Sequence, residues 1–499
     1  MPIVAAFAVP HPPLIIPAVG GDRVSEIQAT VDAYAEVGRR IAALDPDTLV
    51  ISSPHTAMYL DYLHIAPGSG ARGNFARFGA PEVGYTATYD EPFVDELACV
   101  ASAEELPAGT LGERERDLDW GVLVPLHFVA RGYGLVDDRG VPQGTSEDRG
   151  GAQGRYVRLP CRVVRLGIAG LSPAIHYRLG QLVQQVAAKL GRRVVYIASG
   201  DLSHKLTADG PYGYAPEGPA FDQLVCKAFE QGDFLSLLAA DPALCERAAE
   251  CGLRSFQIMA GALDRTEVAP ELLSYEGPFG VGYGIACFIP QGTESACSER
   301  ALDERYAAWH EEHLAATRAA EHPLVRIARY SLESFVRDGV RINGGHDLPA
   351  DLLGNLPDEI ACGKQGAFVS LKKDGQLRGC IGTILPTRES LVEEVCANAV
   401  SAGCRDPRFD PVTTAELPEL IYDVDVLSAP EPIMGPSELD PARYGVIVSA
   451  PGGRRGLLLP NLDGIDTVAE QLRIAARKGG IDLNEPGVSL ERFTVTRYL

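Results

Sequence analysis

The sequence lacks the cysteine patterns of a disulfide-linked protein or a zinc ribbon. Its 11 cysteines are odd in number and scattered, and no two of them form a Cys-x-x-Cys pair. Disulfide-rich secreted domains carry cysteines in even numbers, and four-cysteine structural zinc sites need closely spaced pairs. We therefore expect free thiols in a reducing compartment, and the predicted location is the cytoplasm.

Long apolar runs and an excess of positive charge are also missing. No window of eighteen uninterrupted apolar residues occurs, and the apolar N-terminus has no basic region, so neither a transmembrane helix nor a signal peptide is predicted. The chain has 45 Lys and Arg against 67 Asp and Glu, a formal net charge of −22. Such a surface repels phosphate backbones and anionic lipids, so no nucleic-acid or membrane partner is predicted.

The chain does contain enough apolar sequence for more than one hydrophobic core. It has 499 residues, of which 46% are hydrophobic, and this length predicts two or three domains. Over residues 1–290, β-rich runs at 3–10, 48–54 and 193–200 alternate with stretches that have helical spacing of apolar residues. Such alternation is typical of parallel strands joined by right-handed crossovers. We expect an α/β domain with a mostly parallel sheet flanked by helices.

Two polar segments interrupt this pattern. Residues 136–156 are glycine-rich and predict an exposed insertion loop. Residues 291–304 mark a change in composition and are the predicted linker. The remaining residues, 305–499, begin with a charged helical stretch and continue with short strands and two helices. They predict a second, smaller α+β domain.

Three histidines follow three predicted strands in equivalent places. His11 and His55 come directly after the first two strands, each behind a proline, and His204 follows a third strand together with Asp201. Parallel strands end at one edge of a sheet, where ligands bind in α/β proteins. Neutral imidazole is a common metal ligand, and two histidines with one carboxylate form the facial site of non-heme Fe(II) oxygenases. The pattern leaves two readings open: a shared metal or catalytic site, or histidines that only cap their loops. His127, in an apolar run, is expected in the core or behind such a site.

Four motifs in this region give it a family resemblance. "PHPPLIIP", "SPHT", "GVLVPLHF" and "ASGDLSH" together resemble the class III extradiol dioxygenase B-subunit family and the related Memo proteins, over residues 1–290. The resemblance implies that His11 and His55 are metal ligands and that Asp201 and His204 line the pocket. It also implies that His204 is the acid/base that handles the proton of a catechol hydroxyl, a task that suits an imidazole.

The third ligand remains open between two adjacent residues. The dioxygenases supply a glutamate in the matching segment and Memo proteins a cysteine before a glycine, and here Glu250 precedes Cys251 and Gly252. We expect Cys251, because Gly252 is predicted to end the preceding helix in the left-handed conformation and so fix the direction of the cysteine. Adjacent helical residues lie about 100° apart, so both are not expected to face one metal. If neither ligates, Glu276 is the remaining candidate.

One departure from the family pattern concerns catalysis. Many relatives have Asp-His-Gly before the "PL" segment, whereas this chain reads "LDWGVLVPLHF", with Trp120 in the place of that histidine. If the histidine assists ring cleavage in the relatives, this chain has lost that assistance.

The second domain carries a different set of motifs. "LRGCIGT", with "RDPRFDP", "YDVDVLSAP" and "GLLLP", resembles the AMMECR family over roughly residues 320–499. Around Gly379, Arg378 could hold an anion and Cys380 offer a thiol at a shallow substrate-binding cleft. The same segment could equally be a structural hairpin.

These features predict a mononuclear Fe(II) dioxygenase that acts with O2 on a small phenolic or heteroaromatic compound. Zinc or copper are the alternative metals. A second hypothesis is a Memo-like redox or scaffolding module without oxygenase activity. Proteins of the Memo, AMMECR and radical S-adenosylmethionine types recur together in three-part systems, so a radical enzyme is the partner expected there. A zinc hydrolase is a third hypothesis, and either domain could support a homodimer.

Overall fold

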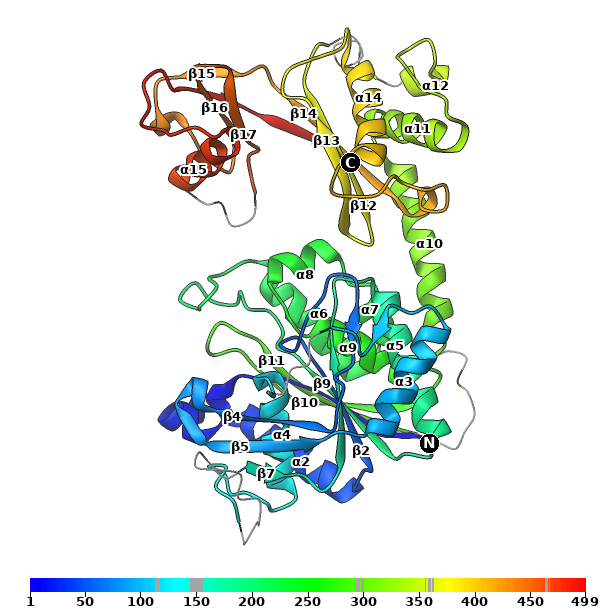
Figure 1. Ribbon diagram of the computed structural model, residues 1–499, viewed down its shortest axis with the longest axis vertical. Coiled ribbons are helices and arrows are strands. Elements are labelled where there is room, and N and C mark those ends of the chain that lie inside the picture. Colours follow the sequence, from blue (N-terminus) through cyan, green and yellow to red (C-terminus); the bar gives the residue numbers. More distant parts are fainter. Residues whose placement is uncertain are drawn as a thin grey trace. The chain divides into compact units, whose positions relative to one another are not determined.

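The computed structural model describes the chain except residues 113–116, 144–155, 292–296, 298–299, 355, 358–359, 361–362, 463–464 and 466. Most of the predicted insertion loop and much of the predicted linker lie outside the described residues. The chain divides into two compact units, Met1–His310 and Glu311–Leu499 (Figure 1). Within the described residues, no helix is both long and apolar enough to cross a membrane.

A six-stranded sheet forms the centre of the first unit. Four neighbouring strands, β1, β9, β2 and β8, run parallel, and β11 and β10 extend the sheet by antiparallel pairing. The α/β prediction with a mostly parallel sheet is confirmed. In sheet order the strands are β10 Val268–Glu276, β11 Tyr283–Pro290, β1 Ile3–Val9, β9 Val194–Ser199, β2 Thr48–Ser53 and β8 Arg162–Gly167.

Both faces of this sheet are buried, which explains the continuous apolar runs in the sequence. Along β1, Ala5 and Phe7 belong to the hydrophobic cluster on the side of α2 and α4, while Ala6 and Ala8 belong to the opposite cluster. Strand residues alternate between faces, so one run supplies both layers. The helices are α2 Gln28–Leu44 and α4 Trp120–Gly132 on one side, and α3 Glu91–Ala103, α5 Pro173–Lys189, α6 Glu217–Gln231 and α9 Leu253–Ala262 on the other.

The second unit is α+β, as predicted, and its sheets are antiparallel. One four-stranded sheet packs its apolar face on α11 and α14, and a second carries α15. The elements are β12 Ala367–Lys373, β13 Gln376–Gly382, β14 Ile421–Leu427 and β19 Val495–Tyr498; β15 Glu431–Ile433, β16 Gly445–Ala450, β17 Arg454–Leu458 and β18 Ser489–Phe493; and helices α11 Pro323–Asp338, α14 Leu391–Cys404 and α15 Val468–Gly479.

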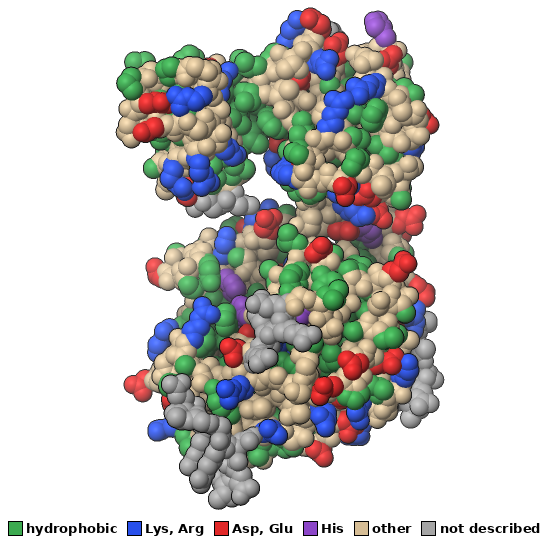
Figure 2. Space-filling model, in the orientation of Figure 1, with side chains coloured by type: hydrophobic (Ala, Val, Ile, Leu, Met, Phe, Trp, Pro, Cys, Tyr) green, Lys and Arg blue, Asp and Glu red, His purple; other side chains and the backbone are tan. Residues whose placement is uncertain are grey.

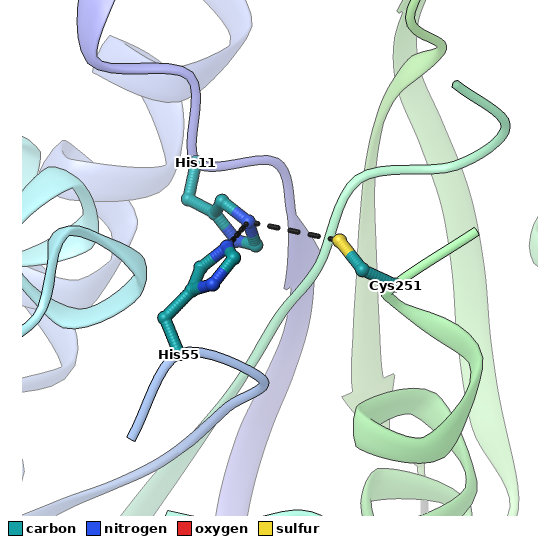
Figure 3. Close-up of side chains that lie close together, drawn as sticks. All are labelled: His11, His55 and Cys251. Atoms are coloured by element: carbon teal, nitrogen blue, oxygen red, sulfur yellow. Dashed lines mark hydrogen bonds between the residues drawn. The ribbon is translucent and has the colours of Figure 1, made fainter. Parts of the chain in front are cut away.

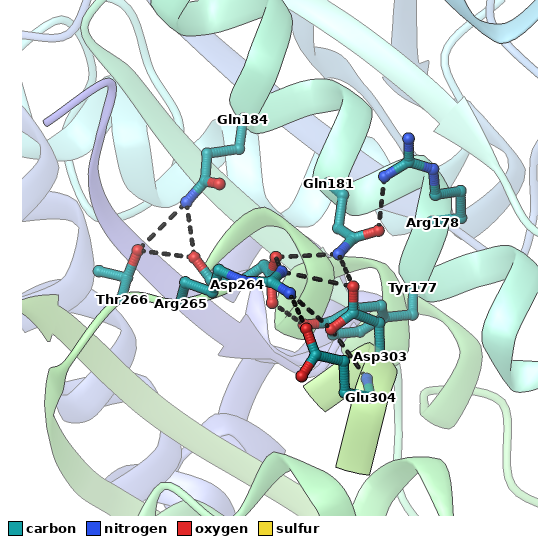
Figure 4. Close-up of polar contacts among 9 residues, drawn as sticks. All are labelled: Tyr177, Arg178, Gln181, Gln184, Asp264, Arg265, Thr266, Asp303 and Glu304. Carbon is teal, nitrogen blue, oxygen red and sulfur yellow. Dashed lines mark hydrogen bonds and ion pairs between the residues drawn. The ribbon is translucent and has the colours of Figure 1, made fainter. Parts of the chain in front are cut away.

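Polar contacts hold the first turn of α10 (Leu302–Ala320) to the first unit (Figure 4). The Arg265 guanidinium lies 3.2 Å from the Asp303 carboxylate and 2.9 Å from that of Glu304. The Gln181 amide donates to Asp303 at 3.1 Å. Leu302 beside them is buried in the core of the first unit. The division of the chain therefore falls after His310, beyond the predicted linker of 291–304.

We propose that the two units fold independently, and a first prediction concerns where the chain can be cut. A chain that ends at His310 is expected to unfold cooperatively, and one that ends at residue 290 to be less stable by about 2–4 kcal/mol. The shorter chain loses the burial of Leu302 and leaves Arg265 without these carboxylates. Urea denaturation measures the difference. Equal midpoints for the two chains would show that residues 291–310 contribute nothing to the first unit.

Candidate metal centre

The carboxyl ends of β1, β9 and β2 lie side by side, and each leads directly to a predicted site residue. His11 follows β1 by two residues, Asp201 follows β9 by two, and His55 follows β2 by two. One donor atom each from His11, His55 and Cys251 lies within 4.8 Å of the others (Figure 3). The expected convergence of strand-end side chains is therefore present, and Cys251 joins it from the loop before α9.

The donor spacing fits one metal ion. The two Nε2 atoms of His11 and His55 are 2.9 Å apart, and His11 Nε2 is 3.7 Å from Cys251 Sγ. Nitrogens about 2.05 Å from one ion are about 2.9 Å apart at a right angle and about 3.4 Å at the tetrahedral angle. A nitrogen and a thiolate at about 2.3 Å from that ion are about 3.6 Å apart at the tetrahedral angle. These three residues could therefore hold a metal with little rearrangement.

The backbone conformation that places Cys251 beside the two histidines differs from the one predicted from the sequence. The preceding helix, α8 (Pro242–Ala248), ends with Ala249 in the left-handed region at φ 54°, whereas Gly252 has φ −93° and begins α9. The expectation that Gly252 ends a helix in left-handed geometry is wrong. Gly252 is instead required by close packing, because a Cβ on it would lie 2.6 Å from the Phe256 ring and 2.9 Å from the carbonyl oxygen of Asp201. Gly200 packs against it from the other side, since a Cβ there would lie 2.1 Å from the Gly252 Cα. This approach brings the Cys251 loop against the end of β9.

Glu250 and Glu276 are placed away from the cluster. The Glu250 carboxylate accepts the Leu253 N–H at 2.7 Å and so caps α9. Glu276 accepts both the N–H and the hydroxyl of Thr30, each at 2.7 Å, in the first turn of α2. Of the three candidates for the third ligand, the structure brings only Cys251 to the two histidines.

Asp201 and His204 lie beside the cluster. Asp201 Oδ1 accepts the backbone N–H of His11 at 2.8 Å, and its Oδ2 is 3.8 Å from His11 Nε2 and 4.0 Å from His204 Nε2. Cys251 Sγ accepts the backbone N–H of Asp201 at 3.3 Å. The ring of Tyr212, which the sequence did not single out, stacks on His204 with centroids 5.1 Å apart. Both residues therefore lie beside the three donors, and their place in a substrate pocket stays a prediction.

Burial sets the protonation states in the cluster. Desolvation, with a smaller contribution from nearby positive charge, lowers the pKa values of His11 and His55 to about 3, so both imidazoles are neutral at pH 7. Burial also raises the pKa of the Cys251 thiol well above its usual value. It raises the pKa of Asp201 to about 6. A neutral imidazole can bind a metal through its lone pair without losing a proton, whereas the Cys251 thiol must lose its proton when a metal binds.

Trp120 forms part of the wall beside this centre. Its ring stacks on the His55 ring, with the two ring centroids 3.9 Å apart. The Arg77 guanidinium lies over the Trp120 ring, 5.2 Å from its centroid. A cavity of about 620 Å³ is lined by these residues, by Phe78 and by Tyr156, among others. Histidine side chains are visible on this face of the first unit, close to cationic ones (Figure 2). Trp120 therefore gives the centre an aromatic neighbour where relatives are expected to have a histidine.

Asp222 supports the loop that carries His204, a role that the sequence did not reveal. Its Oδ1 accepts the Ser203 N–H at 2.7 Å and its Oδ2 accepts the Tyr275 hydroxyl at 2.7 Å. The side chain comes from the middle of α6. The only sequence signal for its role would have been an aspartate at a helical position that faces the core. Burial raises its pKa from 3.8 to about 7.

A second prediction follows from this buried carboxyl. Because its folded pKa is raised, the folded state retains a proton that the unfolded chain releases, and stability is lost as pH rises from about 4 to 7. Asp222→Asn has no proton to lose, and its amide oxygen can accept the Ser203 N–H while its NH2 group donates to the Tyr275 oxygen. Its free energy of unfolding, relative to the wild type, should therefore rise by about 1–4 kcal/mol across that window. Urea titrations between about pH 4 and 8 measure this, and parallel pH profiles would contradict it.

In the second unit, Arg378 and Cys380 lie on β13. The Arg378 guanidinium forms a forked ion pair with Glu416, at 2.8 and 3.2 Å, so the anion it holds belongs to the chain itself. The Ser370 hydroxyl donates to Cys380 Sγ at 3.2 Å, and Asp406 accepts the Cys380 N–H at 2.9 Å. Their assignment to a substrate site stays a prediction.

Known proteins match the chain in both units. The family described as the catalytic LigB subunit of aromatic ring-opening dioxygenase matches residues 5–286, and the AMMECR1 family matches residues 325–498. A protein of Clostridium acetobutylicum is 35% identical over 99% of this chain and 98% of its own length. A protein of Thermotoga maritima is 49% identical over 36% of this chain and 98% of its own length.

Two solved structures of uncharacterized proteins are also similar to parts of the chain. The one from Pyrococcus horikoshii is 32% identical and covers 35% of this chain and 88% of its own, with a TM-score of 0.31. The one from Escherichia coli is 14% identical and covers 57% of this chain and 99% of its own, with a TM-score of 0.35.

Proposed function

The chain belongs to the family of catalytic LigB subunits of aromatic ring-opening dioxygenases, with an AMMECR1 domain after it, and from this membership we propose that it is a non-heme iron oxygenase. Its substrate is a small phenolic or heteroaromatic compound that reacts with O2. The observation that carries the proposal is the convergence of His11 Nε2, His55 Nε2 and Cys251 Sγ beside a cavity large enough for a single-ring compound.

Each residue near the centre has a part in this proposal. Iron held by His11, His55 and Cys251 would supply a Lewis acid and a path for electrons between an aromatic diol and O2. His204, whose side chain is 18% exposed, accepts a hydroxyl proton from the substrate. Asp201 fixes the His11 loop through the backbone N–H of that residue and faces the His204 ring. Trp120 excludes water from one side of His55.

A second function is favoured by the nature of the third donor. Two histidines and a thiolate differ from the facial site of two histidines and a carboxylate, and they suit a softer metal such as copper or zinc. Trp120 also stands where a histidine is expected in ring-cleaving relatives. The alternative is a Memo-like redox or scaffolding protein that serves a radical S-adenosylmethionine enzyme.

Oxygen consumption separates the two functions. The full chain, freed of metal and loaded anaerobically with one equivalent of Fe(II), is mixed with a panel of catechols and hydroxylated heteroaromatics in an oxygen electrode. The dioxygenase proposal expects one O2 consumed per substrate, with a new ultraviolet absorbance from the opened ring, and no uptake with Zn(II). Tight Fe(II) binding without O2 uptake over the whole panel would overturn it in favour of the second function.

A further inference from the structure

A buried chain of hydrogen bonds runs behind His11, on the side of the ring away from the other donors. The Ser199 hydroxyl donates to the backbone carbonyl of Gly121 at 2.6 Å. The same hydroxyl oxygen lies 3.0 Å from His11 Nδ1. Ser199 is the last residue of β9, and Gly121 lies in the first turn of α4. Neither Ser199 nor His11 is more than 1% exposed, so bulk water does not compete for these contacts.

The number of available protons decides the direction of the second bond. A carbonyl oxygen can only accept, so the single hydroxyl proton of Ser199 is committed to Gly121. The Ser199 oxygen must then accept a proton from His11 Nδ1. The neutral imidazole carries one N–H, so its proton is on Nδ1 and Nε2 bears the lone pair.

We infer that Ser199 is a positioning residue that holds His11 in the Nδ1–H tautomer and thereby prepares Nε2 to bind the metal. This inference rests on the metal-binding part of the proposed function and does not depend on oxygenase activity. Metal-binding histidines in proteins commonly donate their other N–H to a nearby acceptor, which fixes the ring and raises its basicity. Here the acceptor is a hydroxyl that is itself fixed by a backbone carbonyl.

The contact between the two histidines agrees with this tautomer. With a lone pair on His11 Nε2, the 2.9 Å contact to His55 Nε2 is a hydrogen bond donated by His55. To bind a metal at this point, His55 would have to give up the Nε2 proton and change tautomer, while His11 would keep its own. The His55 ring is held by stacking on Trp120 and not by a buried hydroxyl. The two histidines therefore differ: His11 already has the tautomer that binds a metal through Nε2, and His55 must change its tautomer to do so.

The tautomer can be observed directly in the metal-free chain. Long-range proton–nitrogen correlation spectra of the full chain with isotope-labelled histidine distinguish the two neutral tautomers, and the His11 signal is assigned by its loss in His11→Gln. We expect the Nδ1–H form in the wild type and a mixture, or the Nε2–H form, in Ser199→Ala. An Nε2–H form of His11 in the wild type would overturn the inference, whatever the chain does with O2.

Metal affinity supplies the second measurement, with variants arranged in matched pairs. Ser199→Ala removes the hydroxyl, while Ser199→Thr and Ser199→Val have the same shape and differ only by it. Zn(II) affinity, measured by competition with a chromophoric chelator, is expected to fall about 10- to 100-fold from Ser to Ala and again from Thr to Val. Equal affinities within both pairs would overturn the inference. If affinity falls equally in Ser199→Thr and Ser199→Val, that loss reflects packing of the added methyl group. The comparison of the wild type with Ser199→Ala then decides whether the inference holds.

Discussion

Cys251→Ser is expected to weaken metal binding by about a hundredfold or more, and Glu250→Gln to change it by less than about threefold. Removal of a group that only supports a ligand already costs about 10- to 100-fold, and Cys251 Sγ is itself one of the three converging donors. A serine hydroxyl has nearly the same size but does not give up its proton to the metal as a thiol does. The loss therefore reports the sulfur donor and not a cavity.

Glu250 is a suitable control because it is adjacent to Cys251 in the sequence but caps α9 and does not face the histidines. Its carboxylate accepts the Leu253 N–H, and the side-chain oxygen of a glutamine can accept the same hydrogen bond. Chelator competition with Fe(II) under anaerobic conditions and with Zn(II) measures both variants. The reverse pattern, a large loss with Glu250→Gln and none with Cys251→Ser, would restore a carboxylate as the third ligand.

Two further variants test the histidine ligands themselves. His11→Ala and His55→Ala are each expected to abolish stoichiometric iron binding while circular dichroism stays that of the wild type. The fold should persist because the backbone N–H of His11 still bonds to Asp201 and that of His55 to Ser53. Full metal retention in both variants would remove the two residues from the site.

The positions of the histidines could be predicted because strand ends are encoded locally. Apolar runs before His11 and His55 mark buried strands, and parallel pairing brings their ends to one edge of the sheet. The direction of Glu250 and Cys251 could not be read in the same way. It depends on the contact of Gly200 with Gly252, which are 52 residues apart and carry no periodic signal.

The residues behind the donors were hidden for a related reason. Ser199 and Asp222 look like an ordinary strand end and an ordinary helix position, and their roles arise from the partners that the fold brings to them. Trp120 was noticed only as a departure from a family pattern, and its stacking on His55 needed the loop after β2 and the start of α4 in one place. Local sequence specified the histidines that reach the site from the strand ends, and tertiary contacts specified which third donor joins them and how each donor is held.

His204→Ala is expected to leave metal binding within about twofold of the wild type and to lower turnover about 100- to 10,000-fold. The ring lies beside Asp201, outside the group formed by His11, His55 and Cys251, and the resemblance assigns it the proton of the substrate. Burial lowers its pKa from 6.5, so the neutral base is the main form at pH 7. Turnover of the wild type should therefore fall as the pH drops through this lowered pKa.

In His204→Ala, this fall of turnover at low pH (the acid limb of the profile) should disappear together with most of the rate. Tyr212→Phe is the matched control, because it retains the ring that stacks on His204 and should keep both the rate and its pH dependence. Metal content by elemental analysis and initial rates of O2 uptake between pH 5 and 8 are measured on the same samples. A His204→Ala chain that loses its metal would make His204 a ligand. One that keeps the rate and the acid limb would place the proton acceptor elsewhere, with Asp201, whose pKa burial raises to about 6, as the next residue to replace.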